Sequence, residues 1–340
     1  MSQQTDPNVP SPQRIFETIN GHQKSAILKA GIDLHVFTAI AEGNYSVEAL
    51  SNRCSASQRG MRMLLDGLTI LGFLEKFDSQ YSLTPDSEAF LVETSPAYMG
   101  GPVEFLLSAP LYDGFRYLTQ AVQNGGTALD EKGTTAEEHP EWVTFARAMV
   151  PMMMGPAKWI AHYLQTKGES IGKVLDIAAG HGMFGIEIGK VFPDARIIGL
   201  DSAPVLVVAK DNAAIAALED RYQTIVGSAF DVEFGSDYDV ILLPNFLHHF
   251  DTDTCTSLLQ KVHTALKPDG RVLTVEFVPN DDRVSPASAD FALIMLVTTP
   301  AGDAYTFSEF DTMFCAAGFP RSEIFSVPES NEHVLVSYKS

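Results

Sequence analysis

Two adjacent histidines stand out in the stretch PNFLHHFD, which covers residues 244–251. An imidazole titrates near neutral pH, so His248 or His249 can take a proton from a hydroxyl group and release it later. A histidine pair can also bind a metal, but adjacent residues at one strand end are expected to point apart. No third ligand stands at a suitable spacing. Proton transfer is therefore the first chemistry that the sequence indicates.

A glycine-rich loop, LDIAAGHGMFG, is expected to run from a strand into a helix. Gly180, Gly182 and Gly185 match the pattern G-x-G-x-x-G, whose glycines let the backbone approach a cofactor at a helix N-terminus. Taken alone, this pattern permits a dinucleotide such as NAD. Asp176 at the end of the preceding strand would repel a diphosphate, whereas it can accept hydrogen bonds from a cationic amino-acid group. The loop therefore favours S-adenosylmethionine as the cofactor.

Side chains suited to a nucleoside follow the next two strands. Asp201 ends the second strand, where a carboxylate can accept two ribose hydroxyls, in NAD as well as in S-adenosylmethionine. Ser228, Ala229 and Phe230 follow the third, placing a hydroxyl and a ring where an adenine edge and face can meet them. The alternative is that Asp176 and Asp201 cap a helix or loop and that Phe230 belongs to the core. The carboxyl ends of parallel strands share one edge, so one crevice is expected.

The elements that position these residues are expected to form an α/β fold from residue 173 onward. Five apolar runs read as buried parallel strands separated by helix-length segments: KVLDIAA, ARIIGLD, YQTIVGSA, YDVILLPN and GRVLTVEFV. The chain closes with SEIFSVPESNEHVLVSYK, two alternating runs around a turn, which predicts a hairpin. The fold class is therefore a doubly wound, Rossmann-like sheet with an antiparallel edge.

The N-terminal part is mostly helical. Ser46 and Ser57 can each cap a short helix, and GFLEKFDSQYSLT alternates as a small hairpin would. Short helices followed by a two-stranded wing are typical of a winged helix, which often binds DNA. Acidic side chains outnumber basic ones over residues 1–165, however, so a dimerisation or substrate-capping domain is the better interpretation.

Composition bounds the class of protein. The chain has 340 residues, 45% of them hydrophobic, and a formal net charge of −20, which disfavours a nucleic-acid or anionic-membrane surface. No targeting segment or membrane span is evident, and the three cysteines form no CxxC pair, so a cytoplasmic protein is expected. The expected division is a disordered leader over 1–12, a helical domain over 13–165 and the sheet domain over 166–340.

The motifs LDIAAGHG, GLD, GSAF, NFLHHFD and LKPDGRVLTVEF, in this order, resemble those of S-adenosylmethionine-dependent O-methyltransferases of the plant caffeate and bacterial hydroxyindole or polyketide type. The resemblance covers nearly the whole chain and implies a winged-helix dimerisation domain, and hence a homodimer. Ala178 replaces the family's first loop glycine, and Ser228 replaces an acidic adenine contact. The expected cofactor-binding residues are Asp176, Ala178, Gly180, Gly182, Asp201, Ser228, Ala229, Phe230 and Asn245.

In the family, the first histidine of a short H-D-W motif is the catalytic base, and His248 matches it. The resemblance assigns Glu276, on the next strand, to orient His248. A second family glutamate aligns with Ala304, so Asp303 can replace it only if its loop turns inward. His249 stands where the family has aspartate, and three readings stay open: a capping or surface residue, a substrate contact, or a metal ligand.

The acceptor is expected to be apolar and aromatic or polyketide-like. In MVPMMMG, residues 149–155, Met149, Met152 and Met153 are candidates to line its pocket, with core packing as the alternative. The resulting hypothesis is a methyltransferase that acts on a hydroxyl, with His248 as base and Glu276 as its partner. The alternatives are carbon or nitrogen methylation on the same fold, an NAD-linked oxidoreductase, and a ligand-sensing winged-helix regulator.

Overall fold

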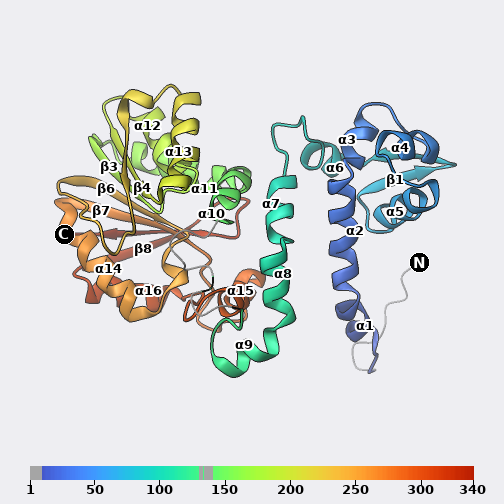
Figure 1. Cartoon of the computed structure of the whole chain (residues 1–340). Coiled ribbons are helices and arrows are strands. Elements are labelled where there is room, and N and C mark those ends of the chain that lie inside the picture. Colours follow the sequence, from blue (N-terminus) through green and yellow to red (C-terminus); the bar gives the residue numbers. More distant parts are fainter. Residues whose placement is uncertain (1–9, 130–132, 134–140) are drawn as a thin grey trace. The chain divides into compact units, whose positions relative to one another are not determined.

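The computed structural model describes residues 10–129, 133 and 141–340. The chain divides into two compact units, and the boundary in the sequence falls between Leu107 and Ser108 (Figure 1). The expected boundary at residue 165 is the C-terminal end of a helix inside the second unit, so the helices over 108–165 are grouped with the sheet. Most of the leader expected over 1–12 lies outside the described residues.

The first unit is a small helical domain with a two-stranded antiparallel wing, as the winged-helix pattern predicts (Figure 1). Ser46 Oγ accepts the N–H of Ala49, and Ser57 Oγ accepts the N–H of Gly60, so both predicted caps are present. Its elements are α1 Gln13–Ile19, α2 Gly21–Asp33, α3 Val36–Ala41, α4 Val47–Arg53, α5 Gln58–Ile70, β1 Leu74–Phe77, β2 Gln80–Leu83, α6 Pro85–Phe90 and α7 Gly100–Leu106.

The second unit is built on a seven-stranded sheet of order β5-β4-β3-β6-β7-β9-β8. β5, β4, β3, β6 and β7 are parallel, while β9 runs antiparallel to both β7 and β8, so the predicted hairpin edge is confirmed. The strands are β3 Lys173–Ile177, β4 Arg196–Asp201, β5 Tyr222–Val226, β6 Tyr238–Pro244, β7 Leu266–Glu276, β8 Arg321–Ser326 and β9 His333–Tyr338.

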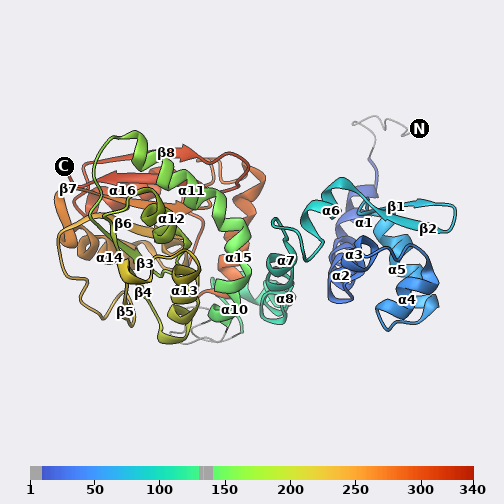
Figure 2. The same cartoon turned by 90° about the horizontal axis from the view of Figure 1, so that it is seen from above.

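Helices cover both faces of this sheet. α11, α12 and α13 lie on one side, and α14 and α16 on the other, over a core of aliphatic and aromatic side chains (Figure 1). α10 lies beside α13, and α8 and α9 pack on α15 (Figure 2). The helices are α8 Ala109–Arg116, α9 Leu118–Asn124, α10 Glu141–Ala148, α11 Val150–Thr166, α12 Met183–Val191, α13 Ala203–Ile215, α14 Thr252–Ala265, α15 Phe291–Thr298 and α16 Phe307–Ala316.

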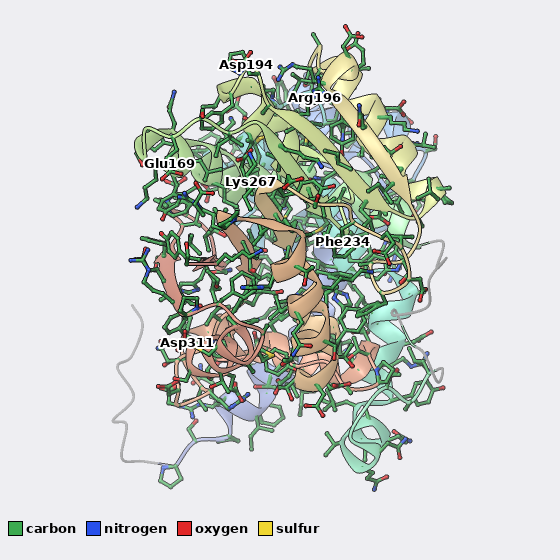
Figure 3. All side chains as sticks on the ribbon, turned by 90° about the vertical axis from the view of Figure 1, so that its left-hand side faces the viewer. Glu169, Asp194, Arg196, Phe234, Lys267 and Asp311 are labelled. Atoms are coloured by element: carbon green, nitrogen blue, oxygen red, sulfur yellow. The ribbon has the colours of Figure 1, made fainter. Side chains whose placement is uncertain are left out.

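Charged side chains gather at the edge where the parallel strands begin. Arg196 opens β4 and Lys267 lies at the start of β7, where it bonds Asp239; Glu169 pairs with Arg271 of β7 (Figure 3). These pairs are partly exposed and contribute little to stability. The functional residues expected from the sequence lie at the opposite edge, where β3 to β7 end.

No helix within the described ranges is long and apolar enough to cross a membrane.

Candidate active site

A cavity of about 460 Å³ opens at the carboxyl ends of β3, β4, β5 and β6, within the second unit. The predicted crevice is therefore present, as expected for a doubly wound sheet. Seven of the expected cofactor-binding residues line it: Ala178, Gly180, Asp201, Ser228, Ala229, Phe230 and Asn245.

The glycine loop joins β3 to α12 and depends on left-handed backbone. Gly180 and Gly182 have φ of 56° and 73°, and Ala178, with φ of 54°, adopts the same region despite its Cβ. At Gly182 a Cβ would lie 2.7 Å from the Tyr222 hydroxyl, so no side chain fits there. Gly182 is thus a packing residue beneath the loop rather than part of the cavity wall.

Asp201 ends β4 and holds this loop in place. Its Oδ2 accepts the Gly180 N–H at 2.9 Å, and its Oδ1 accepts the Ser202 N–H at 2.7 Å. Burial raises the pKa of this carboxyl above its ordinary value, and the two backbone N–H groups oppose that rise. A carboxylate has about four acceptor positions, so two remain for the hydroxyls of a ribose.

Asp176 lies beneath the loop, not in the cavity wall, which corrects the expectation of a direct contact with the cofactor's amino group. Its side chain is fully buried, and its Oδ2 accepts the Gly185 N–H at 3.1 Å, while Oδ1 has no partner among the described residues. Burial raises the pKa of this carboxyl to about 8. The side chain points under α12 because it caps the first turn of that helix.

The loop after β5 forms a third wall. Ser228 Oγ accepts the Phe230 N–H at 3.3 Å, and the Phe230 ring packs edge-on against Phe250 at 4.9 Å between centroids. Lys261 of α14 donates to the carbonyls of Ala229 and Phe230 at 3.0 and 3.3 Å. An ammonium that is bonded to several carbonyls fixes the course of this loop.

His248 and Glu276 form a buried pair at the far end of the cavity. Glu276 ends β7, and its Oε2 lies 2.5 Å from His248 Nδ1, while its Oε1 accepts the Leu247 N–H at 3.0 Å. The side chains are 6% and 1% exposed. Burial favours the uncharged form of each group: it raises the pKa of Glu276 to about 8 and lowers the pKa of His248 to about 3. His248 lies behind the cavity wall, with Phe291 against its ring.

His249, not His248, lines the cavity. The two rings stack at 4.3 Å between centroids, which contradicts the expectation that they point apart. The reason is local: residues 247–249 form a turn of 3₁₀ helix instead of continuing the strand. His249 Nδ1 has no partner among the described residues. Burial lowers the pKa of this ring well below its ordinary value. Over the residues described, no cluster of three or more metal-ligating side chains occurs.

Asn245 connects the end of β6 to α11. It adopts left-handed backbone, with φ of 52°, and its amide Nδ2 lies 3.1 Å from Met153 Sδ. Of the three methionines expected at the pocket, only Met153 lines the cavity. Met149, four residues earlier, is buried at the N-cap of α11, and Met152 is half-buried on the same helix. Neighbouring residues of a helix point in different directions, which separates Met152 from Met153.

Asp303 does not replace the glutamate that Ala304 lacks. Its carboxylate pairs with Arg283 at 3.2 Å and is 38% exposed. Arg283 also bonds Glu309 of α16, which fixes the loop with Asp303 outward. Ala304 itself is buried. The condition under which Asp303 could replace that glutamate, a loop that turns it inward, is therefore not met.

The sequence reasoning missed several residues of the cavity wall. Trp142 and Phe145 on α10 meet edge-on at 5.5 Å, and Trp142 meets His249 at the same centroid distance. His181, within the glycine loop, accepts the Met183 N–H at 3.1 Å through Nδ1, and burial lowers its pKa to about 4. His181 and Phe246 also line the cavity, and both could have been found because they are aromatic residues within the motifs GHG and NFLHHF. Trp142 gave no such signal, because it precedes the methionine segment and belongs to none of the motifs.

The donors and acceptors fit an adenosyl cofactor. Asp201 keeps free acceptor positions, the Phe230 ring offers a face, and the buried Asn245 Oδ1 has no partner among the described residues. A pyrophosphate at the glycine loop, by contrast, would meet no lysine or arginine among the described residues of the wall. The fold and this site define the class of protein: a methyltransferase with a Rossmann-like sheet.

Comparisons with known proteins agree. A family model of the O-methyltransferase domain matches residues 131–320, and one of the O-methyltransferase dimerisation domain matches residues 16–93. The chain therefore belongs to the O-methyltransferase family, and it is an S-adenosylmethionine-dependent enzyme.

Individual relatives resemble the chain over nearly its full length. A 3-hydroxy-5-methyl-1-naphthoate 3-O-methyltransferase from Streptomyces sahachiroi is 26% identical, covering 96% of this chain and 95% of the relative. A phenazine O-methyltransferase from Lysobacter antibioticus is 27% identical, covering 92% of each. A solved structure of a protein from Nostoc punctiforme, described as an O-methyltransferase by inference, is 51% identical with a TM-score of 0.94, covering 97% of this chain and 100% of that one.

Proposed function

We propose that this enzyme transfers a methyl group to a hydroxyl of an aromatic or polyketide-like small molecule, with His248 as general base. The observation that carries the proposal is the buried contact of 2.5 Å between His248 Nδ1 and Glu276 Oε2. A carboxyl group bonded to Nδ1 leaves Nε2 as the basic atom of the ring, and general-base catalysis requires a free ring nitrogen of this kind.

The chain's residues bind the cofactor by its separate parts. Asp201 accepts the ribose hydroxyls, and Phe230 packs on the adenine, whose edge meets Ser228. When bound, S-adenosylmethionine supplies a methyl group on a positively charged sulfur. Asn245 lies between this region and the histidine pair, so its free Oδ1 can accept a hydrogen bond from a ligand on either side.

The acceptor region is aromatic. Trp142, Phe145, Met153 and His249 line the same cavity, and flat ligands pack well against rings and thioethers. The relatives from Streptomyces and Lysobacter are described as acting on a naphthoate and a phenazine, both polycyclic and aromatic. We infer an acceptor with a phenolic hydroxyl on a fused ring system.

The proton is removed in one step. A phenol has a pKa of about 10 and is a poor nucleophile at neutral pH. His248 Nε2 accepts the phenolic proton while Glu276 holds Nδ1 and stabilises the imidazolium that forms. The remaining work is positioning, because displacement at a sulfonium needs two groups in line and little covalent help. His249 contributes by orienting the acceptor through its unpaired Nδ1.

We further propose that the protein is a homodimer. The dimerisation-domain model covers residues 16–93. In α1 the side chains of Ile15, Phe16 and Ile19 are more than half exposed, an apolar face that a second chain can bury. Light scattering coupled to size-exclusion chromatography measures the mass; a monomer at micromolar concentration would reject this part of the proposal.

The test of function separates the two histidines. Calorimetric titration with S-adenosylhomocysteine should give micromolar binding, and titration with NAD none. With a panel of naphthols and hydroxyphenazines, His248→Ala should reduce kcat by at least about 10²-fold and leave the affinity for S-adenosylhomocysteine nearly unchanged.

His249→Ala should raise KM for the acceptor more than it lowers kcat. If His248→Ala retains full turnover, general-base catalysis by this residue is excluded. Methylation at carbon or nitrogen, where His248 would only position the acceptor, then becomes the better hypothesis. Mass spectrometry and NMR of the product identify the methylated atom.

A further inference from the structure

Glu332 is a buried carboxyl group for which the proposed reaction so far has no use. It immediately precedes β9 and is 3% exposed. Its Oε1 has no partner among the described residues, and its Oε2 lies 3.5 Å from Ser330 Oγ, a weak contact. Burial disfavours a carboxylate whose hydrogen bonds are not all satisfied. Carboxyl groups of this kind are concentrated at functional sites.

The sheet register brings Glu332 to the end of β7. Its neighbour His333 is the register partner of Glu276, so the chain passes beside the His248–Glu276 pair as β9 begins. Asn245, at the end of the strand on the other side of β7, donates its N–H to Val275 at 2.8 Å. Three strands therefore end or begin around one point, and each contributes a polar side chain.

The two carboxyl groups interact. Burial raises the pKa of Glu332 to about 7, the negative charge of Glu276 adds to the rise, and the amide of Asn245 and the hydroxyl of Ser330 oppose it. By reciprocity, the charge of Glu332 makes a proton harder to remove from the pair formed by Glu276 and His248.

We propose that Glu332 is a positioning residue for the His248–Glu276 pair, a second buried carboxylate whose negative charge strengthens the pair's hold on the proton taken from the acceptor. It thereby supplies the second negative charge that Ala304 cannot, and that Asp303, paired with Arg283 at the surface, does not. Glu332 acts through Glu276 and Asn245 and makes no contact with the reacting atoms.

Few other titratable groups lie close enough to Glu332 to respond to its charge. Glu276 on β7 is the titratable group whose charge acts on it, and His248 is bonded to Glu276. His333 adjoins it in the chain, but its ring lines a separate hollow with Val278 and Phe307. Asn245 and Ser330 are its uncharged polar neighbours. A change in charge at position 332 is therefore expected to act on the pair.

The inference rests on the proposed role of His248, so its test reads that ring directly and does not require an acceptor. We would label the histidines with ¹⁵N, assign His248 by the signal lost in His248→Ala, and follow its Nε2 resonance against pH. The measurement is made with the full chain saturated with S-adenosylhomocysteine and again without ligand. Glu332→Gln should lower the pH at which Nε2 loses its proton by roughly half a unit or more.

Glu329→Gln is the matched control. It removes the same charge from the same loop, but Glu329 is exposed, so water and salt screen it and the midpoint should stay in place. Glu332→Met also removes the charge, without a hydrogen-bonding group. It should shift the midpoint in the same direction as Glu332→Gln, and it serves as well if the Gln variant folds poorly.

An unchanged midpoint in either Glu332 variant, or an equal shift in Glu329→Gln, overturns the inference. The proposed function fails separately, when His248→Ala keeps its turnover with the phenol panel. A His248 that is essential but insensitive to Glu332 rejects only the second carboxylate. Once an acceptor is found, kcat/KM can be measured against pH for Glu332→Gln. Its acid limb should move to lower pH by as much as the Nε2 midpoint does.

Discussion

The two ends of the cavity are built on different principles. At the cofactor end, the ligand-facing groups are mostly backbone and small side chains, held by a single carboxylate: Asp201 accepts the N–H of Gly180 and of Ser202. At the histidine end, ionisable side chains are packed together out of contact with water, with His248 and Glu276 6% and 1% exposed. Ligand binding at the cofactor end therefore depends on the shape of the backbone, and catalysis at the histidine end depends on where protons are held.

This difference predicts different responses to mutation. Changes at the cofactor end should alter binding and local backbone stability, with a chemical step that is otherwise intact. Changes at the histidine end should leave cofactor affinity alone and alter turnover and its pH dependence, because buried charges shift one another's pKa values. Mixed effects would mean that the two ends are coupled, and Asn245, which faces both, is where coupling is expected.

The largest expected effect is that of Glu276→Gln. The amide introduced at position 276 carries no charge to stabilise an imidazolium at His248. It can also hold the His248 ring in the tautomer that has its proton on Nε2, where the base must accept one. We therefore expect kcat to fall by about 10²- to 10⁴-fold. The affinity for S-adenosylhomocysteine, measured by calorimetry, should change by less than about threefold. A variant that loses cofactor binding and turnover together would contradict the separation of the two ends.

The same variant tests the pH dependence. Burial raises the pKa of Glu276 to about 8, so below this pH the pair carries a proton and Nε2 is not free to accept another. As the pH rises through this value the pair loses that proton, and kcat/KM of the parent enzyme should rise. This rise of kcat/KM with pH should disappear in Glu276→Gln. Its persistence would assign the ionisation to another group, such as the phenol of the acceptor.

The cofactor end was predictable from the sequence because its residues follow strand ends. In a parallel sheet those ends share one edge, so Gly180, Asp201 and Phe230 could be grouped without knowing any contact. The error at Asp176 has the same origin. A strand end fixes where a residue lies along the sheet, but not whether its side chain turns toward the crevice or beneath the adjoining helix.

The histidine end was only partly predictable. The resemblance to known methyltransferases supplied the pairing of His248 with Glu276, and the structure contains it. The stacking of His248 on His249 depends on a 3₁₀ turn that the local pattern does not encode. Glu332 could not be found, because its approach to Glu276 follows from the register of β7 and β9, which long-range packing sets.

Asp201→Asn tests the cofactor end directly. The amide keeps one acceptor oxygen, but it loses the charge that strengthens hydrogen bonds to the Gly180 N–H and to ribose hydroxyls. The Kd of S-adenosylhomocysteine should rise by roughly 10- to 100-fold. Asp231→Asn removes an equal charge from an exposed position after β5 and should leave Kd unchanged. With saturating cofactor, the acid limb of kcat should stay near its parental pH; a displaced limb would show that the two ends are coupled.

The smallest expected effect is at Ala178, where backbone conformation alone is tested. Its φ of 54° is unfavourable for a residue with a Cβ, so Ala178→Gly should stabilise the protein by up to about 1 kcal/mol. The greater freedom of glycine in the unfolded chain offsets part of this gain. The midpoint of urea unfolding measures the result.

Gly180→Ala is the converse change in the same loop. Gly180 has φ of 56°, and the nearest atom to an added Cβ is 3.8 Å away, so the cost is one of conformation and not of collision. This variant should lose about 1 kcal/mol of stability, close to the mirror image of the gain at Ala178. If Ala178→Gly instead lowers the midpoint, the methyl group of Ala178 must make packing contacts worth more than its backbone strain. The cofactor end would then depend on side-chain packing as the histidine end does.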